Sequence, residues 1–235
     1  MLFPTRPSCI VSVPASTVSC QPARSAVPRG FRPGKIMRHF LLALIILTAS
    51  AVCLGQSSPD QAGPEEDGHE VQLWTGGGHS VSGGRGDTGV FNAGLRYGWI
   101  ITAPHLPSFL RGRFEYTVDA VPMFLVFQPT NTAYGLGFNP LGLKWDFVRR
   151  GRLSPYLELS GGTLFTNHNV PTYTNTVNFT SAAALGTHIL SPKYNWSVEL
   201  RYLHISNAGL AVPNPGINTV QVRLGIGRFF NHHGH

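Results

Sequence analysis

Apolar and polar side chains alternate along most of the chain after residue 69, with the period of two that is typical of β-strands. Clusters of glycine, proline, asparagine and serine separate the alternating segments. Eight strands are predicted, over residues 70–79, 90–102, 112–124, 134–148, 154–166, 176–189, 196–206 and 218–230. No stretch shows a helical period, so the pattern predicts an all-β fold over residues 70–230.

The two faces of these strands differ in character. One face is apolar and rich in aromatic side chains; in the third segment it is expected to carry Phe114, Tyr116, Val118 and Phe124. The opposite face holds five basic and five acidic residues: Arg96, Arg113, Lys144, Arg201 and Arg223, with Glu115, Asp119, Asp146, Glu158 and Glu199. Charges of both signs could pair inside a narrow lumen, where an unpaired charge would be costly.

A soluble sheet would bury its apolar face, whereas a membrane barrel turns that face to lipid and its polar face inward. The predicted strands are long enough to cross a bilayer, for which roughly 9–11 tilted residues suffice. Lipid offers no hydrogen bonds to an open sheet edge, so the sheet must close. The sequence predicts an eight-stranded antiparallel transmembrane β-barrel, with a soluble secreted β-protein as the alternative. Such a lumen is filled by side chains, and no conducting pore is expected.

Residues 1–55 are interpreted as an N-terminal extension that ends in a signal peptide. From about Met37, a short basic start precedes the apolar run 40–52 and the small residues at 53–55. Met37 is an alternative start of the chain, and lipid attachment at Cys53 is a competing interpretation. Residues 56–69 are expected to form a flexible linker, and residues 231–235 a short tail. This layout predicts export to the outer membrane of a Gram-negative bacterium.

The net charge of +7 could suggest a nucleic-acid partner, but its distribution argues against one. Six of the 18 basic residues lie in residues 1–55, which leaves 12 basic against 11 acidic residues in the rest of the chain. All three cysteines also lie before residue 56, so the predicted barrel has no thiol chemistry. The barrel is nearly neutral, and nucleic acid is not expected as a partner.

His204 and Ser206 share the outward parity of Leu200 and Tyr202 at the end of the seventh segment. A base beside a hydroxyl is the minimum for an activated serine. The spacing alone favours the simpler interpretation, two polar residues at a strand end in the membrane interface.

The stretch from Arg201 to Leu210, which contains His-Ile-Ser-Asn-Ala-Gly, and the stretch 213–218, which contains Asn-Pro-Gly, resemble the signature of the lipid A 3-O-deacylase (PagL) family. The resemblance implies an outer-membrane barrel that hydrolyses an ester-linked 3-hydroxyacyl chain of lipid A, the membrane anchor of lipopolysaccharide. It implies Ser206 as the nucleophile, His204 as the general base, and Asn207 and Asn214 as supporting residues near the oxyanion. No cofactor or metal is implied, and a homodimer stays open.

The chain departs from the family at one position. Well-studied members have a glutamate twelve residues after the serine, where this chain has Asn218. Its parity places it on the side of His204, while Glu199 has the opposite parity. An asparagine can orient a histidine but cannot supply negative charge. A slower site is expected, and a non-enzymatic barrel that anchors the membrane is the alternative.

Overall fold

A computed structural model describes residues 63–230. The predicted signal peptide, residues 56–62 of the predicted linker and the tail 231–235 lie outside the described residues. Within that part of the chain, no helix is long and apolar enough to cross a membrane.

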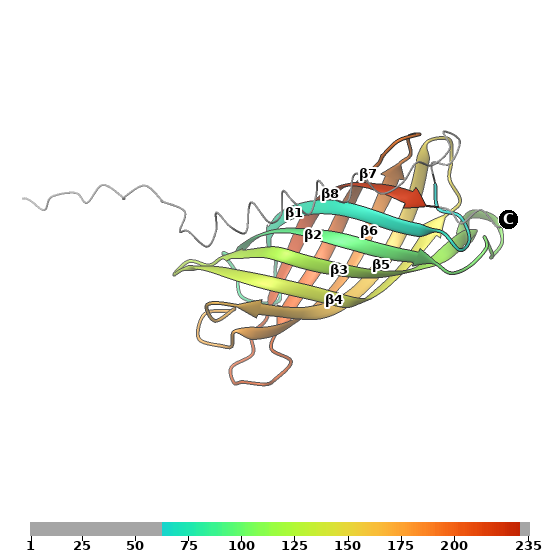
Figure 1. Ribbon diagram of the computed structural model, residues 1–235. Coiled ribbons are helices and arrows are strands. Elements are labelled where there is room, and N and C mark those ends of the chain that lie inside the picture. Colours follow the sequence, from blue (N-terminus) through green and yellow to red (C-terminus); the bar gives the residue numbers. More distant parts are fainter. Residues whose placement is uncertain (1–62, 231–235) are drawn as a thin grey trace, which may run out of the picture. The chain divides into compact units, whose positions relative to one another are not determined.

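Eight antiparallel strands form a closed barrel, as the alternation predicts. They are β1 (His69–Ser80), β2 (Gly89–Ile100), β3 (Gly112–Phe127), β4 (Thr132–Phe147), β5 (Leu153–Thr166), β6 (Val177–Ile189), β7 (Asn195–Ser206) and β8 (Ile217–Phe230). Each strand pairs with its neighbours in sequence, and β1 pairs with β8 to close the sheet (Figure 1). A short 3-10 helix, η1 (Ser108–Leu110), lies between β2 and β3. We call the end of the barrel with His69 and Phe230 the terminal end, and the opposite end, with Ser80 and Ser206, the far end.

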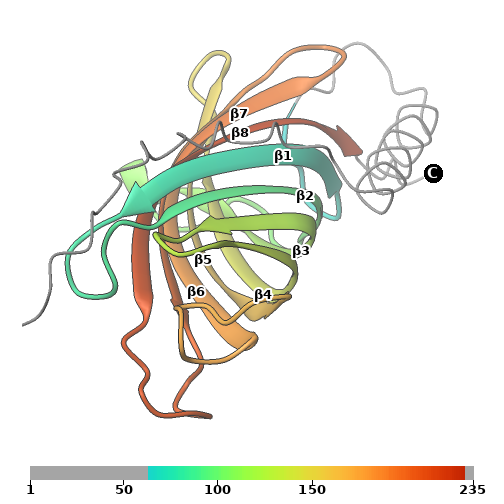
Figure 2. The ribbon, with the colours of Figure 1, turned by 90° about the vertical axis from the view of Figure 1, so that its left-hand side faces the viewer.

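The barrel wall is apolar outside and polar inside, the inverse of a soluble barrel. On β7, Leu200 is 55% and Tyr202 44% exposed, while Glu199 and Arg201 are 1% and 2% exposed. The strands that Figure 2 shows curving around the lumen therefore turn one parity of side chain to the surroundings and the other to the interior. This is the arrangement expected of a sheet that is closed in lipid.

Two groups of ion pairs fill the lumen towards its terminal end, one around Lys144 and one around the arginines of β2, β7 and β8. Arg96 binds Asp119 at 2.8 Å and Glu158 at 2.6 Å, and Arg201 binds Glu158 and Glu199, both at 2.6 Å. We call the whole set the inner network: Glu70, Arg96, Glu115, Asp119, Lys144, Asp146, Glu158, Glu199, Arg201 and Arg223. Nine of these residues were predicted to face the lumen, and Glu70 was not singled out in the sequence.

Arg113 was predicted to lie on the inner face, where it could join the ion pairs, but it lies outside the inner network. It has the parity of Glu115, but it lies at the second residue of β3, next to the terminal end, where the lumen opens. It is only half buried, and no ion pair joins it to the network within residues 63–230.

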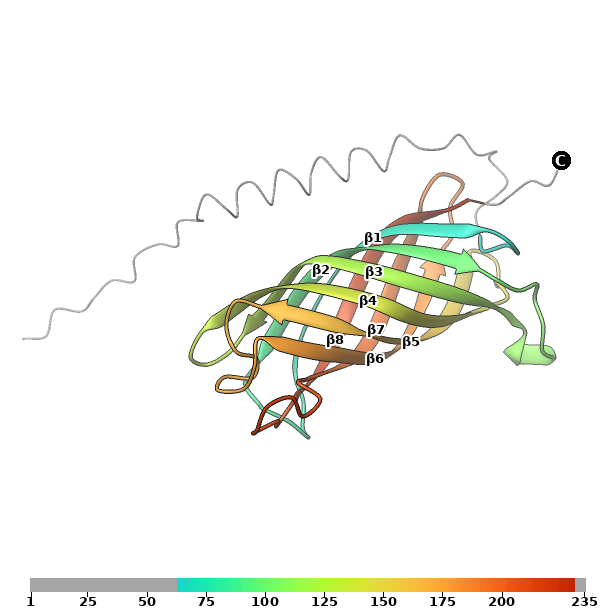
Figure 3. The ribbon, with the colours of Figure 1, turned by 60° about the horizontal axis from the view of Figure 1, so that its bottom comes forward.

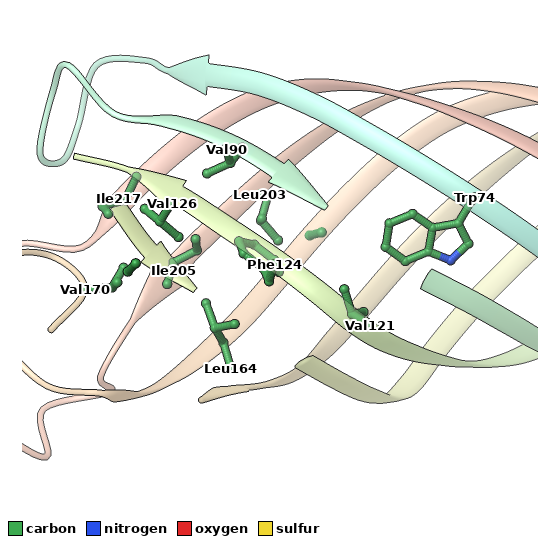
Figure 4. Close-up of a cluster of buried hydrophobic side chains, with 12 residues drawn as sticks. Trp74, Val90, Val121, Phe124, Val126, Leu164, Val170, Leu203, Ile205 and Ile217 are labelled. Atoms are coloured by element: carbon green, nitrogen blue, oxygen red, sulfur yellow. The ribbon is translucent and has the colours of Figure 1, made fainter. Parts of the chain in front are cut away.

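The lumen at the far end is filled by apolar side chains, which we call the apolar plug: Trp74, Val90, Val121, Phe124, Val126, Ala133, Leu164, Val170, Ala182, Leu203, Ile205 and Ile217. Figure 4 shows the labelled members pointing towards one another inside the barrel. A cavity of about 20 Å³ lies between plug and network, with room for about one water.

Phe124 was predicted to face outward, and that prediction was wrong. The pairing of β3 with β4 shifts between Val121 and Phe124, and a bulge inserts residues that exchange the two faces of a strand. Beyond the shift, Phe124 and Val126 point inward and are 5% and 0% exposed.

Candidate active site

The last two strands bring His204 and Asn218 together on the outer face of the barrel. The two residues are direct cross-strand partners between β7 and β8. Their neighbours Leu203, Ile205 and Ile217 belong to the apolar plug, so alternate residues are turned outward. The inward position of these plug residues therefore determines that the site residues face outward.

A hydrogen bond of 2.6 Å joins His204 Nδ1 to Asn218 Oδ1. Because an amide oxygen can only accept, the proton of this bond belongs to Nδ1. The other ring nitrogen, Nε2, then keeps its lone pair, which is the tautomer that a general base requires. A neutral amide thus orients the imidazole in the reactive state.

Ser206 lies two residues beyond His204 on the same face, at the end of β7, and is half buried. Residues two apart on a strand lie ~6–7 Å apart along its axis. Within residues 63–230 the structure records no hydrogen bond between the Ser206 hydroxyl and His204. Such bonds often tighten only when substrate is bound. The structure brings His204 and Asn218 into contact and leaves Ser206 beside them.

Asn207 organises the loop that follows β7. Its side chain is fully buried, with Nδ2 donating to the Ala211 carbonyl at 3.1 Å and Oδ1 accepting from the Gly209 amide at 2.9 Å. Its backbone N–H donates to Asn214 Oδ1 at 3.1 Å. Asn214 itself is exposed, and its Nδ2 has no partner recorded within the described chain. Both side-chain groups of Asn207 are engaged in the loop, whereas Asn214 keeps a free donor at the surface.

The connection between β1 and β2 covers the other side of the pair. The Val81 amide donates to the Asn218 carbonyl at 2.8 Å, and the Arg85 amide donates to the Gly216 carbonyl at 2.9 Å. Figure 3 shows both connections extending from the same end of the barrel. This cover explains why Asn218 is only 6% exposed although its parity turns it outward.

Gly216 lies beside the ring of His204. A Cβ placed on this residue would lie 2.9 Å from His204 Cε1, and its φ of +64° is unfavourable for any other residue. The space beside the imidazole therefore depends on the absence of a side chain at this position.

The family model of lipid A 3-O-deacylase (PagL) matches residues 90–227, more than half of the chain and all of β3 to β7. The chain belongs to the PagL family. The resemblance inferred from residues 201–218 is thereby confirmed.

The fold comparison agrees with this membership of the PagL family. A crystal structure of the outer membrane enzyme PagL is 20% identical and has a TM-score of 0.50, with 66% of this chain and 97% of that chain covered. A structure of Neisserial surface protein A (NspA) is 13% identical, with a TM-score of 0.46, and covers 73% of this chain and all of its own. No curated protein matches the chain in sequence. The predicted outer-membrane location of an eight-stranded barrel is confirmed.

Glu199 is not the acidic residue of this site. It faces the lumen, as its parity predicts, and accepts hydrogen bonds from Arg201 at 2.6 Å and from the Tyr156 hydroxyl at 3.0 Å. Sequence reasoning missed Gly216 as a contact of His204 and missed the β1–β2 connection altogether. The Gly83-Gly84 pair was the one available signal for the latter, since a Cβ on Gly84 would lie 3.0 Å from the Gly216 carbonyl oxygen.

Proposed function

We propose that this member of the PagL family is a serine esterase that removes an ester-linked 3-hydroxyacyl chain from lipid A in the outer leaflet of the outer membrane. The observation that carries the proposal is the hydrogen bond of 2.6 Å between His204 Nδ1 and Asn218 Oδ1, two residues from an outward-facing serine. A polar pair of this kind on the lipid-facing wall has no structural task inside the barrel. Membership of the family supports lipid A as the substrate.

The proposed reaction follows from the orientation of the imidazole. His204 Nε2 takes the proton of the Ser206 hydroxyl while Ser206 Oγ attacks the ester carbonyl carbon. The tetrahedral intermediate collapses, the ester C–O bond breaks, and His204 returns the proton to the departing lipid A hydroxyl. Water, deprotonated by the same nitrogen, then releases the 3-hydroxy fatty acid from the serine and restores the free enzyme.

Asn214 is the donor best suited to the oxyanion of this intermediate. Its Oδ1 is held by the Asn207 amide, which fixes the side chain, and its Nδ2 remains available. A donor positioned where negative charge develops lowers the barrier without reorganisation. Asn207 acts as a positioning residue, because it holds the loop and Asn214 and touches no reacting atom in this scheme.

The orientation of the barrel supports access to the substrate. Because the number of strands is even, the start of β1 and the end of β8 lie at the same end of the barrel, the terminal end. If the chain inserts from the periplasm, this end stays on the periplasmic side. The far end then faces outward. Outer-membrane barrels commonly have their longer loops on that side, and 81–88, 167–176 and 207–216 are longer than 148–152 and 190–194 at the terminal end, where only 101–111 is of similar length. The site would lie at the level of the lipopolysaccharide leaflet.

The decisive experiment is mass spectrometry of lipid A from a Gram-negative host that expresses residues 37–235. The wild type should remove one hydroxyacyl chain, and Ser206→Ala should remove none, because its side chain lacks the attacking oxygen. The Ser206→Ala barrel must be folded in the outer membrane, as judged by its heat-modifiable mobility. Unchanged lipid A with a folded wild-type barrel would reject the proposal and favour a barrel that anchors the membrane without catalysis.

A further inference from the structure

Positive charge outside the lumen is concentrated at the terminal end of the barrel. The connections 101–111, 148–152 and 190–194 at this end carry Arg111, Arg149, Arg150, Arg152 and Lys193. The four loops of the far end carry a single cation, Arg85. Closure of the barrel does not require more cations at one end than at the other, so these residues need a separate explanation.

Three of these arginines line one cavity of about 410 Å³ on the outside of the barrel. It lies between the β2–β3 connection and the turn from β4 to β5, and its walls include Ser108, Phe109, Arg111, Val148, Arg149 and Arg150. The light-green segment that Figure 3 shows beyond the end of β2 forms one wall.

Hydrogen bonds fix the two walls of the cavity to each other. The Val148 amide donates to the Arg111 carbonyl at 2.9 Å, and Trp145 Nε1 donates to the Leu110 carbonyl at 3.1 Å. The ring of His105 packs edge-on against Trp145, with centroids 4.7 Å apart. The cavity is therefore part of the folded wall.

The three guanidinium groups have no carboxylate partner in the described part of the chain. No ion pair within residues 63–230 includes Arg111, Arg149 or Arg150. The acidic residues of β1 to β8 all face the lumen, and no ion pair in the described chain joins Glu65, Glu66 or Asp67, before β1, to these arginines. Exposed arginines on both walls of one cavity are suited to an anion from outside the protein, and guanidinium binds phosphate oxygens in a bidentate manner.

Apolar side chains beside these arginines indicate that the anion belongs to a lipid. Phe109 is 70% exposed and Val148 38% exposed, next to the cations. Pro155 lines the cavity, and Leu157, two residues further on the same face of β5, is 47% exposed on the lipid-facing wall. A phosphate in the cavity would thus sit at the end of an apolar path along which acyl chains could lie.

We propose that this cavity binds the phosphodiester headgroup of an anionic glycerophospholipid in the leaflet at the terminal end of the barrel, which is the periplasmic leaflet in the orientation given above. Arg111, Arg149 and Arg150 neutralise the headgroup, and Phe109 and Val148 contact the start of its acyl chains. The site lies at the opposite end of the barrel from Ser206 and is independent of the hydrolysis of lipid A.

Native mass spectrometry of protein purified from outer membranes into detergent tests this site. We expect phosphatidylglycerol to bind the wild type about 10-fold more tightly than it binds Arg149→Ala/Arg150→Ala, since lost charge-assisted hydrogen bonds weaken binding by about this factor. The matched control is Arg152→Ala/Lys193→Ala, which removes two charges at the same end but outside the cavity and should bind like the wild type. The zwitterionic phosphatidylcholine should bind more weakly than phosphatidylglycerol.

Three results would overturn the proposal. Equal losses in both double variants would indicate general electrostatic attraction, and equal affinity for the two lipids would remove the preference for an anion. Displacement of phosphatidylglycerol by an equal concentration of inorganic phosphate would indicate a site for free anions. Ser206→Ala should bind phosphatidylglycerol like the wild type, so a failure of lipid A hydrolysis leaves this test intact.

Discussion

Strand β7 contributes to two polar systems that differ in charge and in surroundings. Glu199 and Arg201 face inward and join the inner network, where ion pairs as short as 2.6 Å surround each charge with opposite charges. His204 faces outward, is half buried, and binds the neutral side chain of Asn218. A buried charge is stable only when opposite charges and hydrogen bonds surround it. A general base instead needs a nitrogen that carries no proton, which a neutral partner on the other nitrogen allows.

The difference shows how one strand keeps structural and reactive groups apart. A shift of one residue in register would exchange the faces of every side chain on the strand. The inner network and the apolar plug together resist such a shift, because it would expose charges to lipid and place Leu203 and Ile205 outside. The outward position of the candidate site therefore depends on the residues that point inward.

The largest effect is expected from removing the central cation of the inner network. Lys144 Nζ lies 2.8 Å from both Glu70 and Glu115 and 3.3 Å from Asp146. Lys144→Met leaves these carboxylates without their cation and should lower the free energy of unfolding by about 3–5 kcal/mol. Urea titration of the barrel in detergent micelles measures this.

Two further variants separate charge from packing in that prediction. Lys193→Met removes a lysine from the exposed turn before β7 and should leave the midpoint unchanged. Lys144→Met/Glu115→Gln removes one of the stranded carboxylates and should recover part of the loss. An unchanged midpoint in Lys144→Met would refute the assigned role of the inner network.

A smaller effect is expected from crowding the imidazole on the outer face. Gly216→Ala places a methyl group 2.9 Å from His204 Cε1 and should lower kcat/KM for lipid A about 100-fold, because a displaced catalytic base costs about this much. The matched control is Gly209→Ala in the same loop. Its φ of +82° brings similar backbone strain, but a Cβ there meets nothing within 4 Å. Equal losses in the two variants would show that loop strain, and not the contact with His204, is responsible.

The smallest effect is expected from replacing the neutral partner of His204 with a charged one. Asn218→Asp keeps the shape of the side chain and adds the negative charge that the inner carboxylates have. It should raise kcat about 10-fold, because a charge-assisted bond stabilises the imidazolium more than a neutral one. Asn218→Leu, which removes the bond to His204 Nδ1, should lower kcat by a similar factor. An aspartate variant no faster than the natural enzyme would show that orientation is the whole contribution of this position.

The strands could be predicted from the sequence because outward apolar and inward polar residues alternate along every strand of a membrane barrel. The seventh strand was predicted at 196–206 and is Asn195–Ser206, since the alternation there is uninterrupted. Phe124 was misplaced because a bulge near Pro122 interrupts the alternation, and nothing in the local pattern shows where the pairing shifts. Arg113 has the predicted inward parity but no ion pair with the inner network in the described chain, because parity gives a face and not the depth of the lumen.

The candidate site could be predicted only in part. Parity alone places His204, Ser206 and Asn218 on one face, but their contact depends on the register of β7 with β8, which the loop 207–216 sets. The contacts of Val81 and Arg85 with Asn218 and Gly216 join segments more than 130 residues apart in the chain. Packing between such distant segments leaves no periodic signal, so the cover of the site became visible only in the structure.

The same cover has a consequence for the timing of activity during biogenesis. Asn218 and Gly216 are held by the connection that follows β1, and β1 is also the strand that pairs with β8 to complete the barrel. The contacts that support the imidazole therefore form only when β1 pairs with β8 and closes the sheet. A chain still in transit through the periplasm would carry the reactive residues without their support, and competence to cut lipid would begin only at the destination.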